Sequence, residues 1–70
     1  MGGLKSLIVN FNNSRNLDGA IYYIETNRSK LRVPELNDVL EWAGRNTNDY
    51  KGKARKIEAV LDYLKNDYMK

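Results

Sequence analysis

Hydrophobic residues recur at the spacing of one helix face in four separate segments of the chain. In each segment, apolar side chains occupy positions i, i+3, i+4 and i+7, which lie along a single stripe of an α-helix. The four stripes are Leu4-Leu7-Ile8-Phe11, Leu17-Ala20-Ile21-Ile24, Leu36-Val39-Leu40-Ala43 and Ile57-Val60-Leu61-Leu64. This pattern predicts a small all-α domain of three or four helices whose stripes are buried against one another.

Residues with known preferences at helix ends support the same division. Asn16 or Ser14 suits the N-cap of the second helix, because a short polar side chain there can accept a hydrogen bond from a free backbone amide. Pro34 suits the first turn of the third helix, and Gly44 suits its C-terminal end. We therefore expect one domain over residues 1–70, with a helical prefix at 4–28 and a helix-loop-helix unit at 33–66.

The first two segments also contain residues that favour β-strands. Residues 7–11 and 20–24 are rich in aromatic and β-branched side chains, and an Asn-rich stretch at 12–16 separates them. A β-hairpin packed on two helices is therefore an alternative for the N-terminal part. Helices are favoured because neither segment alternates cleanly between apolar and polar residues.

The amino-acid composition excludes several classes of function. The chain has 70 residues, with 12 Lys and Arg against 9 Asp and Glu, and it contains neither Cys nor His. Disulfides, Cys/His zinc sites and catalytic arrangements that need His or Cys are thereby excluded. We expect no enzyme activity, catalytic residue, metal site or cofactor. The longest apolar run, Leu7-Ile8-Val9, predicts no membrane span, and we expect a cytoplasmic protein of a bacterium, an archaeon or one of their viruses.

Basic residues form two clusters in the sequence. Residues 45–56 contain five basic residues and one acid, and a second cluster lies just before the third predicted helix. Clustered Lys and Arg side chains bind nucleic-acid phosphates irrespective of base sequence.

The candidate nucleic-acid-binding residues are Arg45, Lys51, Gly52, Lys53, Arg55 and Lys56, with Arg28, Lys30 and Arg32 in support. Exposed surface charge is the simpler interpretation of the same residues. The two clusters are expected to meet on one side of the domain if the third and fourth helices pack antiparallel or at a steep angle.

The order of aliphatic residues and glycines from 33 to 61 carries a family resemblance. Val33, Glu35, Leu36 and Leu40 lead to Ala43-Gly44, and a polar loop then leads to Gly52-Lys53, Ile57 and Val60-Leu61. This order resembles the SAP-like and Rho N-terminal-like helix-extended loop-helix modules, which are small nucleic-acid-associated motifs. The resemblance implies two roughly parallel helices joined by an extended loop. It also implies that the loop and the start of the second helix, at Lys51, Gly52, Lys53, Arg55 and Lys56, face DNA or RNA.

Aromatic residues indicate a competing function. Trp42 lies off the apolar stripe of the third helix, so it either seals the core edge against Tyr50 or the first helices or anchors a protein partner. Tyr22 and Tyr23 are neighbours and cannot both face the core, so at least one is expected to be exposed. A protein-interaction module that uses Trp42, Tyr22 and Tyr23 is thus the alternative to a DNA- or RNA-binding protein. A monomer and a homodimer are both compatible with so small a core.

Overall fold

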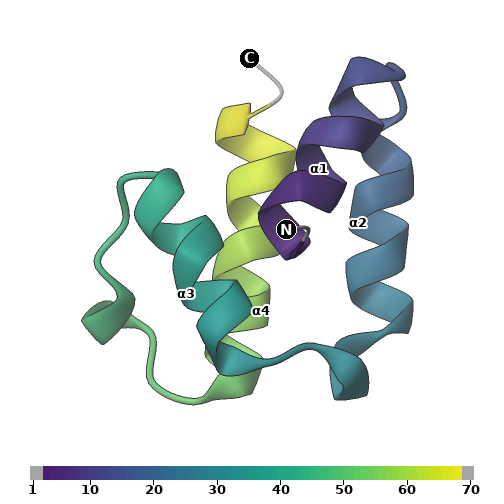
Figure 1. Ribbon diagram of the computed structural model, residues 1–70. Coiled ribbons are helices and arrows are strands. Elements are labelled where there is room, and N and C mark those ends of the chain that lie inside the picture. The colour runs from purple at the N-terminus through teal and green to yellow at the C-terminus, as the bar shows by residue number, and fades with distance from the viewer. Residues whose placement is uncertain (1–2, 69–70) are drawn as a thin grey trace.

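Four α-helices follow one another along the chain in the computed structural model, which describes residues 3–68 (Figure 1). The helices are α1 (Leu4–Asn13), α2 (Leu17–Thr26), α3 (Val33–Trp42) and α4 (Lys53–Asp62). Three short elements join or extend them: the 3-10 helices η1 (Arg28–Lys30) and η2 (Thr47–Asp49), and the π-helix η3 (Tyr63–Tyr68). The all-α prediction is confirmed. The N-terminal hairpin alternative is wrong, since no strand occurs within residues 3–68.

Burial explains why the strand-like segments are helical. Leu4 and Ile8 are buried on α1, and Leu17, Ala20, Ile21 and Ile24 are buried on α2. These positions share one face of a helix, whereas in a strand adjacent residues such as Ala20 and Ile21 would point to opposite sides. The helical arrangement therefore removes both stripes from water, and this gain outweighs the local preference for strands.

Helices α1 and α2 run in opposite directions and are joined by a short turn (Figure 1). The side chain of Asn16 caps α2, because its Oδ1 accepts a hydrogen bond from the Gly19 amide at 3.3 Å, as expected for an N-cap residue. Gly19 lets the two helices approach closely. A Cβ atom at this position would lie 2.6 Å from Cε1 of Phe11 on α1.

Helices α3 and α4 run side by side in the same direction, with an extended loop returning the chain from the end of one to the start of the other (Figure 1). Glycine is needed at both ends of this loop. Gly44 has φ 78° directly after α3, and Gly52 has φ 90° directly before α4. Backbone in this region is strained for residues with a side chain, so the two glycines fix where each helix stops and starts.

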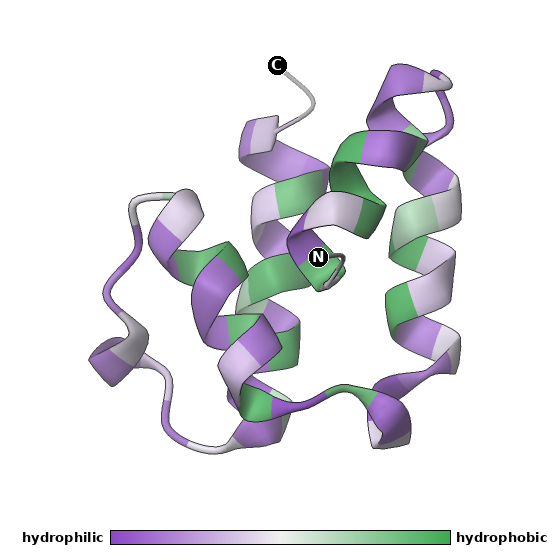
Figure 2. Ribbon diagram, viewed as in Figure 1, coloured by the Kyte–Doolittle hydropathy of each residue, from purple (hydrophilic) through white to green (hydrophobic). Residues whose placement is uncertain are grey.

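The buried side chains form one cluster to which all four α-helices contribute. Helix α4 packs against α2, α3 and η3, while α1 packs against α2 and α3. In Figure 2 the hydrophobic segments of the helices face one another, and the connecting segments at the lower end are mainly hydrophilic. The described chain measures 31 × 25 × 22 Å.

The π-helix η3 extends α4 and packs against the end of α3. Ring centroids of Tyr63 and Tyr68 lie 6.4 Å and 5.4 Å from that of Trp42. In a π-helix, residues five apart stack along one side, whereas an α-helix would separate them by about 140°. The π geometry therefore brings both tyrosines onto the same tryptophan.

Candidate nucleic-acid interface

The parallel course of α3 and α4 brings the two basic clusters together. Because both helices begin at the same end of the domain, the segment before α3 lies beside the segment before α4. The Lys53 ammonium donates a hydrogen bond to the Ser29 carbonyl at 3.2 Å, and the Arg28 guanidinium pairs with Glu58 at 3.2 Å. The clusters were expected to meet through antiparallel or steeply crossed helices. The helices are instead parallel, which is the direction that the resemblance to SAP-like and Rho N-terminal-like modules implied, and this arrangement also brings the clusters together.

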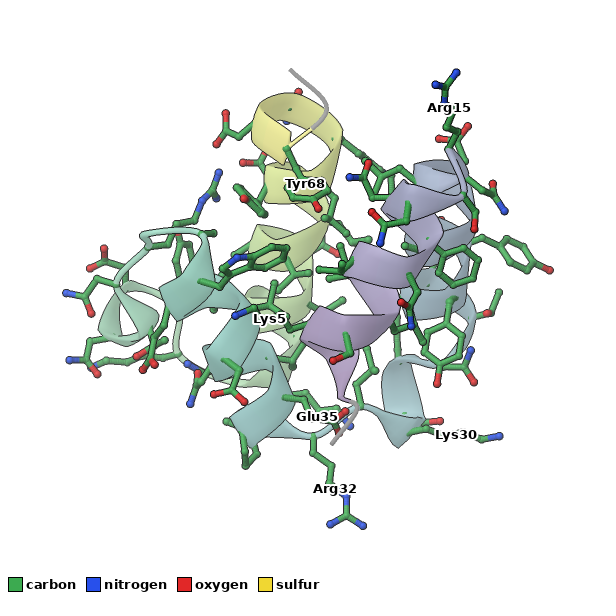
Figure 3. The ribbon with its side chains drawn as sticks, turned by 45° about the horizontal axis from the view of Figure 1, so that its top comes forward. Lys5, Arg15, Lys30, Arg32, Glu35 and Tyr68 are labelled. Atoms are coloured by element: carbon green, nitrogen blue, oxygen red, sulfur yellow. The ribbon has the colours of Figure 1, made fainter. Side chains whose placement is uncertain are left out.

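We call the resulting surface the basic end and define it by Arg28, Lys30, Arg32, Lys51 and Lys53. Lys30, Arg32 and Lys51 are exposed, and none of the three makes an ion pair within residues 3–68. In Figure 3, Lys30 and Arg32 extend from the lower end of the molecule, whereas Arg15 extends from the opposite end. The basic end therefore presents cationic groups to solvent from two separate stretches of the chain.

Backbone amides add to the positive character of the same end. Arg32 occupies the N-cap position of α3 and Gly52 that of α4. An Arg side chain has no acceptor and Gly has no side chain, so neither residue can cap the first amides of its helix. The N-terminus of α4 thus presents partial positive charge beside the basic residues, whereas in the first turn of α3 Pro34 has no N–H and Glu35 adds a carboxylate.

Arg45 belongs to a different part of the molecule. Its guanidinium bridges Asp67 at 2.7 Å and Asp62 at 3.2 Å, and its side chain is only 20% exposed. It also lies over the ring of Tyr63, 5.7 Å from the centroid. The hydrogen bond to Asp67 raises the pKa of Arg45 against the opposing effect of burial. The expectation that Arg45 is a basic loop residue facing solvent is therefore wrong: it ties the start of the loop to η3.

Lys56 is also turned inward. The residue is 8% exposed, and its ammonium donates a hydrogen bond to the Thr47 carbonyl at 3.0 Å. The side chain thus spans from α4 to η2 and holds the loop against the helix. The expectation of an exposed Lys56 is wrong, because the fourth position of α4 faces the loop and not solvent.

The remaining candidate, Arg55, is exposed on another side of α4. It lines a shallow groove together with Arg45, Tyr50 and the acidic residues Asp49, Glu58 and Asp62. Three carboxylates near one exposed guanidinium make this groove less suited to phosphates than the basic end. Sequence reasoning did not single out Glu58, whose pairing with Arg28 joins residues 30 positions apart and leaves no local signal.

The aromatic candidates are divided between two sites. Trp42 is half-buried and packs against Tyr63 and Tyr68, while the Lys5 ammonium of α1 lies 5.3 Å from its ring centroid. Of its two expected roles, sealing the core edge is the one that these contacts describe, with tyrosines of η3 and Lys5 of α1 as its neighbours. Tyr22 is 69% exposed and Tyr23 is 37% exposed, which confirms that at least one of the two faces solvent. The tyrosine pair lies on α2, at the other side of the molecule from the end of α3 (Figure 1).

Two further observations concern the described residues 3–68. No helix in this range is long and apolar enough to cross a membrane, and no group of three Asp or Glu side chains is placed to hold a metal ion. Comparison of the chain with family models, with curated proteins and with solved structures finds no match.

Proposed function

We propose that this protein binds DNA or RNA by contacting phosphates with the basic end, without strong base specificity. The observation that carries the proposal is the meeting of two basic segments at the shared N-terminal end of α3 and α4. Lys30, Arg32 and Lys51 supply exposed cations there, and the N-terminus of α4, which has no side-chain cap, supplies backbone donors. Clustered cations of this kind favour nucleic acid because each phosphate contact releases condensed counterions.

The resemblance of residues 33–61 to SAP-like and Rho N-terminal-like modules supports the same surface. In those modules the loop and the start of the second helix face nucleic acid, which corresponds here to Lys51, Gly52, Lys53, Arg55 and Lys56. Of these residues, Lys51 and Lys53 belong to the basic end. Arg28, Lys30 and Arg32, which precede the module, extend the surface across η1. Lys56 and Arg45 hold the loop in place and act on binding only through the fold.

The test compares two double variants with the same change in net charge. Lys30→Gln with Lys51→Gln removes two exposed cations from the basic end, and the control, Arg15→Gln with Lys65→Gln, removes two exposed cations elsewhere. Fluorescence anisotropy is measured with labelled duplex DNA, single-stranded DNA and RNA at low and physiological salt. We expect the first variant to bind at least about tenfold more weakly than the control, because it loses two phosphate contacts.

Two results would contradict the proposal. One is equal weakening in both double variants, which would indicate a response to net charge alone. The other is absence of binding by the unmodified protein to all three nucleic acids at low salt. Circular dichroism of each variant checks that the fold is retained, which we expect because all four substituted side chains are exposed.

A further inference from the structure

A small pocket opens beside the basic end, where the start of α1, the end of α2 and the segment entering α3 meet. Its volume is about 260 Å³. The side chains that line it are those of Leu4, Leu7, Leu31, Tyr23, Lys30 and Glu35. Three leucines and one tyrosine thus line the pocket together with one cation and one carboxylate, so that its surface is about as polar as it is apolar.

Lys30 belongs both to the pocket and to the basic end. It lines the pocket and is one of the exposed cations of the basic end. Lys30 and Arg32 project from the same end of the molecule as Glu35 in Figure 3. A pocket of mixed polar and apolar lining that includes a tyrosine therefore lies directly beside groups that attract phosphate.

We infer that this pocket accepts a base of a single-stranded nucleic acid, with Tyr23 as the stacking partner and with Lys30 and Arg32 on the adjoining phosphates. The inference rests on the proposed function and specifies its substrate. In a duplex the bases are paired and stacked, so they cannot enter such a pocket, whereas unpaired bases stack readily on aromatic side chains. The pocket therefore selects single strands over duplex.

The carboxylate of Glu35 has a consistent role in this arrangement. A carboxylate near phosphates is unfavourable on electrostatic grounds alone. Inside a base pocket, however, it accepts a hydrogen bond from the exocyclic amino group of adenine or cytosine, as carboxylates do at base edges. Strands of adenine and cytosine are for this reason the suitable probe.

The experiment measures binding of a labelled single strand of about 12 adenine and cytosine nucleotides, a length that a small domain can cover. The same strand annealed to its complement is the duplex probe. Tyr23→Ala is compared with Tyr22→Ala, since Tyr22 is the adjacent tyrosine, is more exposed and does not line the pocket. Tyr23→Phe keeps the ring without its hydroxyl.

We expect Tyr23→Ala to weaken single-strand binding about fivefold to hundredfold, which corresponds to the loss of one stacked base. Tyr23→Ala should change duplex binding by less than about twofold. Tyr22→Ala should leave single-strand and duplex binding unchanged, and Tyr23→Phe should bind the single strand as the unmodified protein does. Thermal unfolding monitors stability, and since Tyr23 lies outside the buried core, the Ala variant is expected to fold.

The two proposals fail in different ways. If single strand and duplex bind equally well and Tyr23→Ala has no effect, the base pocket is excluded while binding through the basic end stands. If Tyr22→Ala weakens binding as much as Tyr23→Ala, the assignment of the pocket is also wrong. If neither probe binds at low salt, the proposed function itself fails.

Discussion

The ammonium groups of Lys51 and Lys56 have different surroundings. Both lysines belong to the basic stretch around Gly52 in the sequence. The structure separates them, because Lys51 is exposed whereas Lys56 is buried and donates to the Thr47 carbonyl. The sequence could predict that positive charge gathers in this region. It could not predict which charges face solvent, since this depends on where the loop folds back onto α4.

The different surroundings of these two lysines predict different effects of the same substitution. Lys56→Met keeps most of the buried aliphatic stem but removes the hydrogen bond to Thr47, so it should lower the free energy of unfolding by about 1–2 kcal/mol. Lys51→Met should change it by less than about 0.5 kcal/mol. Urea denaturation of both variants gives the comparison. Equal midpoints would show that the Lys56 contact does not stabilise the loop.

Ionisation of Tyr63 is expected to lower the stability of the folded protein at alkaline pH. Its pKa is raised above the ordinary value of 10.0, mainly because burial disfavours the phenolate, with Tyr68 and Asp67 acting in the same direction and Arg45 opposing them. The unfolded chain therefore loses this proton at lower pH than the folded chain. The contribution of Tyr63 to the free energy of unfolding is fully present below the pKa that Tyr63 has in the unfolded chain. It is lost as the pH rises through the higher pKa that Tyr63 has in the folded chain.

Comparison with Tyr63→Phe isolates this effect from the other tyrosines and lysines. The variant keeps the ring that packs on Trp42 but has no phenolic proton. Above pH 10, we expect the free energy of unfolding to fall less steeply in Tyr63→Phe than in the unmodified protein. Urea midpoints at several alkaline pH values measure both slopes. Parallel curves would mean that Tyr63 titrates alike in the folded and unfolded states.

At the scale of elements, the four helices could be predicted because their apolar stripes coincide with good helix ends. Pro34 in the first turn of α3 and the Asn16 cap of α2 are examples that the structure confirms. The π-helix η3 could not be predicted in this way. Its apolar residues continue the stripe of α4, so the spacing predicts only a longer α-helix. The π geometry depends on contacts from another part of the chain. Trp42 contacts Tyr63 and Tyr68, and Arg45 pairs with Asp62 and Asp67, so each contacts two residues that are five positions apart.

The contact between α1 and α2 yields a prediction that opposes simple helix propensity. Ala is a better helix former than Gly by about 1 kcal/mol, so Gly19→Ala in α2 would stabilise an isolated helix. Here the new Cβ would lie 2.6 Å from Phe11 Cε1 and 2.7 Å from Nδ2 of the capping residue Asn16. Displacing the ring and the cap should cost more than the propensity gain, for a net loss of about 1 kcal/mol.

A double-mutant cycle on the melting temperature tests this prediction. Phe11→Ala removes the ring that the new methyl group meets, so Gly19→Ala should be less destabilising, or even stabilising, in that background. The two substitutions would then show a favourable coupling free energy. If Gly19→Ala instead raises the melting temperature of the otherwise unmodified protein, the prediction is wrong, and α1 and α2 accommodate the methyl group at little cost.

At the scale of the whole molecule, the position of charge follows from topology. A net charge of +3 on a small domain has little meaning by itself, and the basic residues lie in several stretches of the sequence. The parallel arrangement of α3 and α4 is what places η1 beside the start of α4. Hydrophobic spacing identified the helices and the charge pattern identified both basic clusters, but neither fixes how neighbouring helices are oriented. The parallel direction was implied only by the resemblance to SAP-like and Rho N-terminal-like modules.

The size of the basic end limits how strongly binding can depend on salt. Single-stranded nucleic acid releases about 0.7 counterion for each neutralised phosphate, and the surface is defined by Arg28, Lys30, Arg32, Lys51 and Lys53. Arg28 already pairs with Glu58, so we expect log K to fall against log salt with a slope of about −2 to −3 for a single strand. Lys51→Gln should reduce the magnitude of that slope by about 0.7, and Arg15→Gln should not change it. Anisotropy titrations over a range of salt concentrations measure all three slopes. A slope much steeper than about −3 would require cations outside the basic end, and a slope near zero would mean that binding does not depend on phosphates.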